Sequence, residues 1–153
     1  MLRHIDLLDQ DEKALLLDAP ALITILVAGA DGEMDEEEKE WAVKLAEIRS
    51  FDYNTKLNDY YEQVSPIFAD RLKAYHTTLP KETEARLAAV TAKLTEVNRI
   101  LHKVDDLDAV LLYKDFKSFA KHVAKASGGI MRWLAIGPKE AQVIDLPMID
   151  EFK

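Results

Sequence analysis

The chain has 153 residues, 48% of them hydrophobic and 31% charged, which is enough for one folded domain spanning residues 1–153. It has no cysteine, so disulfides, thiolate metal sites and a cysteine nucleophile are excluded, and the absence is compatible with a reducing compartment. The formal net charge of −8 argues against general nucleic-acid binding, because that affinity depends on Lys and Arg neutralising phosphates.

Apolar residues recur at intervals of three and four through most of the chain, which predicts an all-α domain, a compact bundle of about seven or eight helices. The second helix is apolar on all sides and is expected at the centre of the bundle. Its run from Leu22 to Val27 also suits a buried strand, but no second run of this kind exists to pair with it. The expected helices are 5–17, 20–29, 36–49, 54–64, 66–77, 81–104, 107–126 and 138–145.

The longest apolar run, Ala19 to Ala30, has twelve residues, whereas a helix needs about twenty to cross a bilayer. No membrane-spanning segment is therefore expected. The first nine residues carry acids within their apolar stretch and lack a small-residue cleavage site, so they do not resemble a secretory signal. These features predict a cytoplasmic protein.

The segment between the second and third helices is strongly acidic, since positions 31–40 hold seven acids and one lysine. Asp31 and Gly32 form a turn pair, and Asp35 with Glu38 three residues later predicts a capping box. This capping interpretation does not account for Asp31 itself, because crowded carboxylates repel one another unless solvent, lysines or a cation offsets them.

A divalent cation would offset the repulsion among these carboxylates. Read from Asp31, the spacing of acids and glycine matches the second half of an EF-hand calcium loop. The first half is absent, since the two earlier ligand positions are Val27 and Gly29. Oxygen ligands favour calcium or magnesium over zinc, with Asp31, Asp35 and Glu38 as candidate ligands. A cation site and a purely structural helix cap both remain open.

The expected helix 81–104 has an apolar seam with a period of 3.5 residues. This seam suits either a coiled-coil dimer or packing within the chain's own bundle. Packing within the bundle is favoured, because Leu and Val occupy the reverse of the positions that stabilise parallel dimers, and three heptads are near the minimum for a free coiled coil. The seam residues are Leu87, Val90, Leu94, Val97, Leu101 and Val104.

Lysines form a stripe on the expected helix 107–126, opposite its apolar face. The simplest interpretation is a solvated surface. The alternative is a docking site for a protein, for which the acidic segment 31–40 is a second candidate. The stripe consists of Lys114, Lys117, Lys121 and Lys125.

An apolar helix, the run from Ala30 to Glu38 and an amphipathic helix together resemble the first repeat of the TerB family, the tellurite-resistance TerB and TerB-like proteins. The resemblance implies a cytoplasmic, all-helical protein with two pseudo-symmetric halves, each carrying an Asp-Gly loop whose acids have been linked to metal binding. It further implies a non-enzymatic function in stress or tellurite resistance, with other proteins of a stress-response system as partners. A homodimer is compatible with the sequence.

The resemblance implies a second loop, and a degenerate copy lies at Ala126 to Ile130 and, after six further residues, at Gly137 to Glu140. Ser127 replaces the leading Asp, and Gly137 replaces the N-cap Asp. Glu140 is the one strong oxygen donor left in this copy. The candidate metal ligands are therefore Asp31, Asp35, Glu38 and Glu140.

Catalytic motifs are missing from the sequence. It contains no His-Glu-x-x-His pair, P-loop, dinucleotide fingerprint or Gly-x-Ser-x-Gly elbow. We therefore expect no enzymatic activity. Trp41 and Trp133 follow the two loops and are expected to be core anchors. Surface or half-buried positions are expected for the histidines, His4, His76, His102 and His122.

Overall fold

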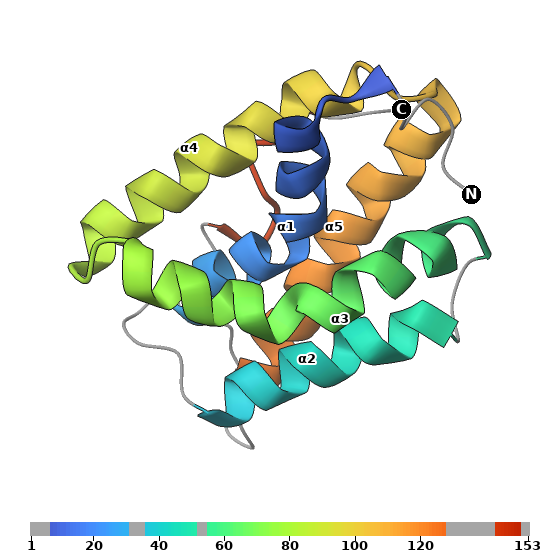
Figure 1. The fold of residues 1–153 in the computed structure, drawn as a ribbon. Coiled ribbons are helices and arrows are strands. Elements are labelled where there is room, and N and C mark those ends of the chain that lie inside the picture. Colours follow the sequence, from blue (N-terminus) through green and yellow to red (C-terminus); the bar gives the residue numbers. More distant parts are fainter. Residues whose placement is uncertain (1–6, 31–35, 52–54, 128–142, 151–153) are drawn as a thin grey trace.

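The computed structural model describes residues 7–30, 36–51, 55–127 and 143–150, which contain five helices and no strand. The helices are α1 (Gln10–Ala28), α2 (Glu36–Phe51), α3 (Thr55–Thr78), α4 (Thr83–Leu101) and α5 (Asp106–Ser127) (Figure 1). The all-α prediction is confirmed. None of the described helices is both long and apolar enough to cross a membrane.

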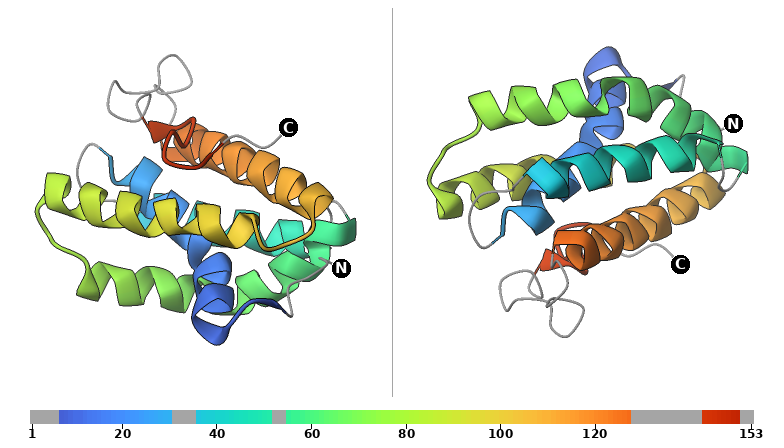
Figure 2. Two further views of the ribbon diagram at one scale, coloured as in Figure 1. Left: turned by 90° about the horizontal axis from the view of Figure 1, so that it is seen from above. Right: turned by 90° about the horizontal axis from the view of Figure 1, so that it is seen from below.

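Helix α1 is the centre of the bundle and packs against α3, α4 and α5 (Figures 1 and 2). Every residue from Ala19 to Ala28 is buried, which confirms a central helix rather than a strand in this segment. The helix begins with the capping box that Asp9 and Glu12 form. The Glu12 backbone donates to the Asp9 carboxylate at 2.8 Å, and the Asp9 backbone donates to the Glu12 carboxylate at 3.0 Å.

The predicted number of seven or eight helices is wrong for the described residues, because two prolines lie inside helices rather than between them. Pro20 lies within α1 and deprives the Leu16 carbonyl of its usual backbone donor. The Tyr60 hydroxyl of α3 donates to that carbonyl at 2.6 Å, so the helix continues. Pro66 lies on the exposed side of α3, where water can satisfy the freed carbonyl. Two pairs of expected helices therefore merge. The pair 5–17 and 20–29 becomes α1, and the pair 54–64 and 66–77 becomes α3.

The C-terminal part of the chain explains the rest of the difference in the number of helices. Most of the expected helix 138–145 lies outside the described residues, and after Val143 the described chain forms turns. The Asn98 side chain of α4 fixes these turns, because it donates to the Met148 carbonyl at 2.9 Å and accepts from the Asp150 backbone at 2.7 Å. The seam of α4 packs inside the bundle, as predicted: Val90, Leu94, Val97, Leu101 and Val104 are buried, and Leu87 packs against them.

Helix α2 lies on the outside of the bundle. It packs mainly against α3 and more lightly against α5 (Figure 2, right). Its buried apolar side chains are small or few, namely Ala42, Leu45 and Ala46. Half-buried Val43 also packs against the core, and the buried side chain of Arg49 adds a polar contact to α5.

Candidate functional site

The predicted metal ligands fall mostly outside the described residues. Asp31, Asp35 and Glu140 belong to segments 31–35 and 128–142, and nothing in the structure brings them together or separates them. Glu38 is described, in the first turn of α2. Within the described ranges, no group of three or more His, Asp or Glu side chains could hold a metal ion. The calcium or magnesium site remains a prediction.

Glu38 is nevertheless unusual among the acids of this turn. Its side chain is buried, with 8% of the residue exposed, whereas Glu36 and Glu37 are exposed. Helix α2 begins at Glu36, immediately after the predicted cap residue Asp35. The N-terminal dipole of α2 stabilises negative charge in this turn. Burial therefore distinguishes Glu38 from its neighbours Glu36 and Glu37.

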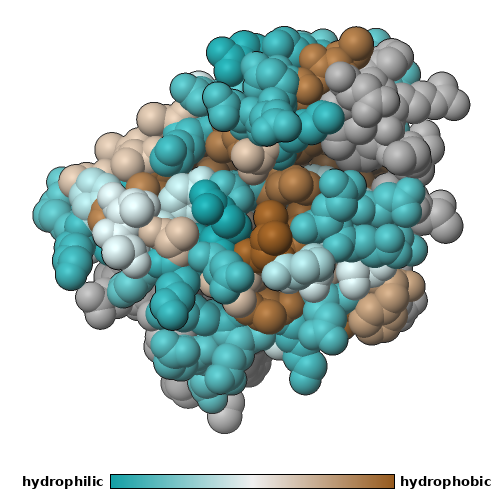
Figure 3. Space-filling model, viewed as in Figure 1, coloured by the Kyte–Doolittle hydropathy of each residue, from teal (hydrophilic) through white to brown (hydrophobic). Residues whose placement is uncertain are grey.

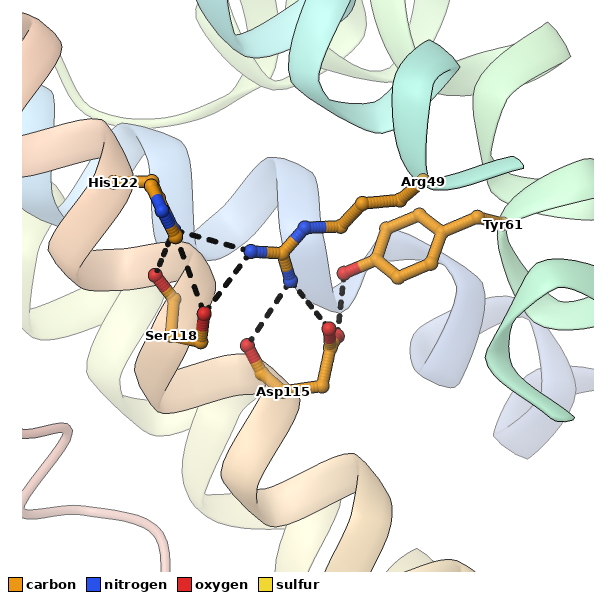
Figure 4. Close-up of polar contacts among 5 residues, drawn as sticks. All are labelled: Arg49, Tyr61, Asp115, Ser118 and His122. Atoms are coloured by element: carbon orange, nitrogen blue, oxygen red, sulfur yellow. Dashed lines mark hydrogen bonds and ion pairs between the residues drawn. The ribbon is translucent and has the colours of Figure 1, made fainter. Parts of the chain in front are cut away.

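The structure reveals a buried polar network that the sequence did not predict. Arg49 of α2 reaches across to α5, where its guanidinium forms an ion pair with the Asp115 carboxylate (Figure 4). The Tyr61 hydroxyl of α3 donates to the other oxygen of that carboxylate. Both charged side chains are almost fully buried, with exposed fractions of 4% for Arg49 and 0% for Asp115. The ion pair and the Tyr61 hydrogen bond together join three helices.

The outer side of the network reaches solvent through His122. The Arg49 guanidinium donates to Ser118 Oγ at 3.1 Å and lies 3.2 Å from His122 Nδ1, which is also 2.9 Å from the Ser118 carbonyl. With Nδ1 protonated, His122 donates to this carbonyl, and with Nδ1 bare it accepts from Arg49. His122 therefore has a partner in either tautomer.

Burial and charge fix the protonation state of the Tyr61 phenol in this network. Burial raises the pKa of Tyr61 well above its ordinary value of 10.0, and the nearby Asp115 charge raises it further. The phenol therefore stays protonated and donates to the carboxylate. The Asp115 carboxylate pairs with the Arg49 guanidinium. The arrangement suits a structural role, in which these contacts hold α2, α3 and α5 together.

Two more buried acids anchor α1 to its neighbours. Asp18 accepts a bidentate pair of bonds from Arg71 of α3, both at 2.9 Å, and a bond from the Tyr75 hydroxyl at 2.7 Å. The Asp18 hydrogen bond raises the pKa of Arg71. Glu12 forms an ion pair with Lys103 at 2.6 Å, and this contact, with the Asp9 backbone bond, lowers the Glu12 pKa below its ordinary 4.5.

Helix α2 has a groove on each side. The groove toward α3 has a volume of about 610 Å³, and its floor includes Val43, Ala69 and Leu72. The groove toward α5 has a volume of about 600 Å³, and Trp41 and His122 lie in its walls. The space-filling view shows apolar residues gathered in the middle of the face over α3, surrounded by hydrophilic ones (Figure 3).

The prediction that Trp41 is a core anchor is wrong. Trp41 is 42% exposed, because α2 packs its small residues Ala42 and Ala46 inward and directs position 41 toward the groove beside α5. Trp133 lies outside the described residues. The lysine stripe is solvated, as predicted, since Lys114, Lys121 and Lys125 are exposed and Lys117 is half-buried. The three described histidines, His76, His102 and His122, are exposed.

A signal for the buried network was present in the sequence. Asp115 lies three residues after Leu112 and four before Phe119, so it occupies the apolar face of α5. Arg49 similarly follows Ala42, Leu45 and Ala46 on the inner face of α2. A charged residue at a core position on each of two helices indicates a buried ion pair, because an isolated buried charge is too costly.

No protein-family model matches the chain, and neither the curated proteins nor the solved structures include a match. The resemblance to TerB proteins therefore stays an expectation that depends on the acidic loop and its degenerate second copy.

Proposed function

We propose that the protein is a non-enzymatic, TerB-like binding protein whose acidic loop between α1 and α2 takes a divalent cation, calcium or magnesium. The observation that carries the proposal is the burial of Glu38 at the start of α2, next to a loop dense in acids. Asp31, Asp35 and Glu38 are the proposed ligands, with Glu140 from the second loop as a fourth. Hard carboxylate oxygens suit these two cations.

The proposed role in the cell comes from the resemblance to TerB proteins. We propose a cytoplasmic protein with two pseudo-symmetric halves, which acts in stress or tellurite resistance together with other proteins of that response. Helix α1, the acidic loop and α2 form the first half in this proposal, and α5 begins the second. Expression of the chain in a tellurite-sensitive bacterium should raise the tolerated tellurite concentration, and Asp31→Asn should remove that protection.

Cation binding is tested by thermal unfolding with and without calcium or magnesium. A ligand that binds only the folded state at ten times its dissociation constant adds roughly 1.4 kcal/mol of stability. In a domain of this size that shift raises the melting temperature by about 3–6 °C. Asp31→Asn and Glu38→Gln should abolish the shift, while Glu37→Gln, an exposed acid of the same turn, should retain most of it. No shift at roughly 10 mM of either cation would overturn the proposal.

A second candidate function is a helical protein-interaction module whose acidic loop is only a helix cap. The two grooves beside α2, each of about 600 Å³, favour it. In that case Asp31→Asn leaves the melting temperature nearly unchanged in every buffer, because an acid that neither binds a cation nor caps a helix contributes little to folding. The cation titration therefore separates the two functions.

A further inference from the structure

The exposed face of α2 has the spacing of a helix-pairing seam. Three of the five large hydrophobic side chains that are exposed in the described part of the chain lie on this helix: Trp41 at 42%, Ile48 at 38% and Phe51 at 68%. Together with Glu37 and Lys44, these three residues define a seam at positions 37, 41, 44, 48 and 51. The intervals of four, three, four and three residues give the 3.5-residue period with which one helix packs on another. Trp41 and Ile48 are partly covered, and no described helix lies over the outer side of α2 (Figure 2, right).

Helix α5 supplies a basic surface beside this seam. The two helices run antiparallel: Arg49 near the end of α2 contacts Asp115 and Ser118, whereas Trp41 near its start shares a groove with Lys125. The one acid of α5 after its first turn, Asp115, points inward to Arg49. The outer surface of α5 is therefore purely basic over the lysine stripe.

The start of the seam is acidic, because Glu37 belongs to it and Glu40 lies beside it in the groove toward α5, whereas Glu36 pairs with Lys39. In an antiparallel pair of α2 helices, this acidic start lies beside the end of the other α2, where the neighbouring part of α5 carries Lys114. Two-fold symmetry repeats the contact, so both ends of the pair are matched in charge.

We propose that the seam of α2 and the adjoining basic face of α5 form a homodimer interface, in which two copies of α2 pack antiparallel about a two-fold axis. Trp41 of each copy then packs on Ile48 of the other, and Phe51 lies against the start of the other α2. The two Lys44 side chains meet near the axis, where Glu40 and Glu47, each within a turn, offset their charge. This inference does not depend on the proposed cation site, because Glu38 lies on the buried side of α2.

The interface is expected to be weak. Helix α2 has 16 residues and is therefore about 24 Å long. One helix pair with its flanking charges falls at the low end of specific interfaces, so a dissociation constant of about 10 μM is expected. Because charge pairs contribute, raising the salt concentration should weaken the dimer.

The test is sedimentation of the full chain across a concentration series from about 1 to 200 μM, the range that brackets the expected dissociation constant. Wild-type protein should move from the monomer mass of 17.3 kDa toward twice that mass. Ile48→Glu and Phe51→Glu should each weaken dimerisation at least tenfold, since each places a charge in the seam. Leu7→Glu is the matched control, because Leu7 is also an exposed apolar residue but lies on the segment before α1. Circular dichroism checks that each variant is folded.

A charge exchange tests the orientation. Lys114→Glu should weaken the dimer, and adding Glu37→Lys and Glu40→Lys to the same chain should restore it. A monomer throughout the series at low salt would overturn the proposal, as would a dimer that survives both Ile48→Glu and Phe51→Glu. A monomer that instead sediments with vesicles containing anionic phospholipid would also overturn it, because the face would then bind a membrane.

Discussion

The buried pair between Arg49 and Asp115 makes the most demanding test of the structure. Replacing Asp115 by Asn keeps the size of the side chain but removes its charge, which leaves the Arg49 guanidinium buried with only neutral acceptors. Removing one partner of a buried pair typically costs 3–5 kcal/mol. The Asn oxygen still accepts from Arg49 or Tyr61, so we expect a loss near the low end, about 3 kcal/mol. Asp115→Ala should lose about 5 kcal/mol.

The assay is urea unfolding of each variant, followed by the helical circular dichroism signal. The matched control is Asp70→Asn, an exposed acid in the middle of α3, which should change the free energy of unfolding by less than about 0.5 kcal/mol. A double-mutant cycle with Arg49→Met separates the ion pair from other effects, because Asp115→Asn should cost much less once no buried cation remains.

Two results would refute this reasoning. One is a loss below about 1 kcal/mol for Asp115→Asn, which is the range of an exposed ion pair. The other is an equal loss for Asp115→Asn with and without Arg49, which would mean that the carboxylate does not interact with the guanidinium.

Two further predictions concern α1. Glu12→Gln should flatten the decline in stability below pH 4.5, because the Lys103 contact lowers the folded-state pKa of Glu12, so the wild type loses this stabilisation as acid protonates the carboxylate. Urea midpoints at several pH values measure this, and equal pH profiles for the two proteins would contradict it. Tyr60→Phe should lower the free energy of unfolding by roughly 1–3 kcal/mol in the same assay, since it leaves the buried Leu16 carbonyl without a donor. A neutral effect would mean that this bond is not what lets α1 continue past Pro20.

The sequence predicts the elements of this fold whose pattern is local. The uninterrupted apolar run after Ala19 indicates a helix buried on all sides, and the seam from Leu87 to Val104 indicates the packing face of α4. The lysine stripe marks the solvent side of α5 for the same reason. In each case the periodicity within one segment carries the information.

The joins between helices could not be predicted in the same way, because they depend on tertiary contacts. Pro20 breaks an isolated helix, and it is tolerated here through the Tyr60 hydroxyl, which lies forty residues further along the chain. Pro66 is tolerated for a different reason, since its side of α3 faces solvent. A local sequence pattern shows neither the Tyr60 hydrogen bond nor the solvent exposure at Pro66. The prediction therefore divided two long helices at their prolines.

The residues of the candidate site also differ in how far the sequence predicts them. The acidic loop was conspicuous in the sequence because its composition is unusual, although the position of Asp31 is outside the described residues. The pairing of Arg49 with Asp115 was not conspicuous, because each residue is ordinary by itself. Only their placement on apolar faces distinguishes them, and which cation meets which carboxylate is fixed by the packing of α2, α3 and α5.

Helix α2 connects the proposals made for this protein. The packing of its inner side on α3, together with the contacts of Arg49 with Asp115 and Ser118 of α5, fixes its rotation in the bundle. That rotation keeps Glu38 on the buried side and Ile48 on the exposed side. A cation at the loop would act on the start of the helix, whereas a second copy would pack along its outer face. The two proposed activities would therefore share one helix but no side chain, so substitutions that remove one are expected to leave the other.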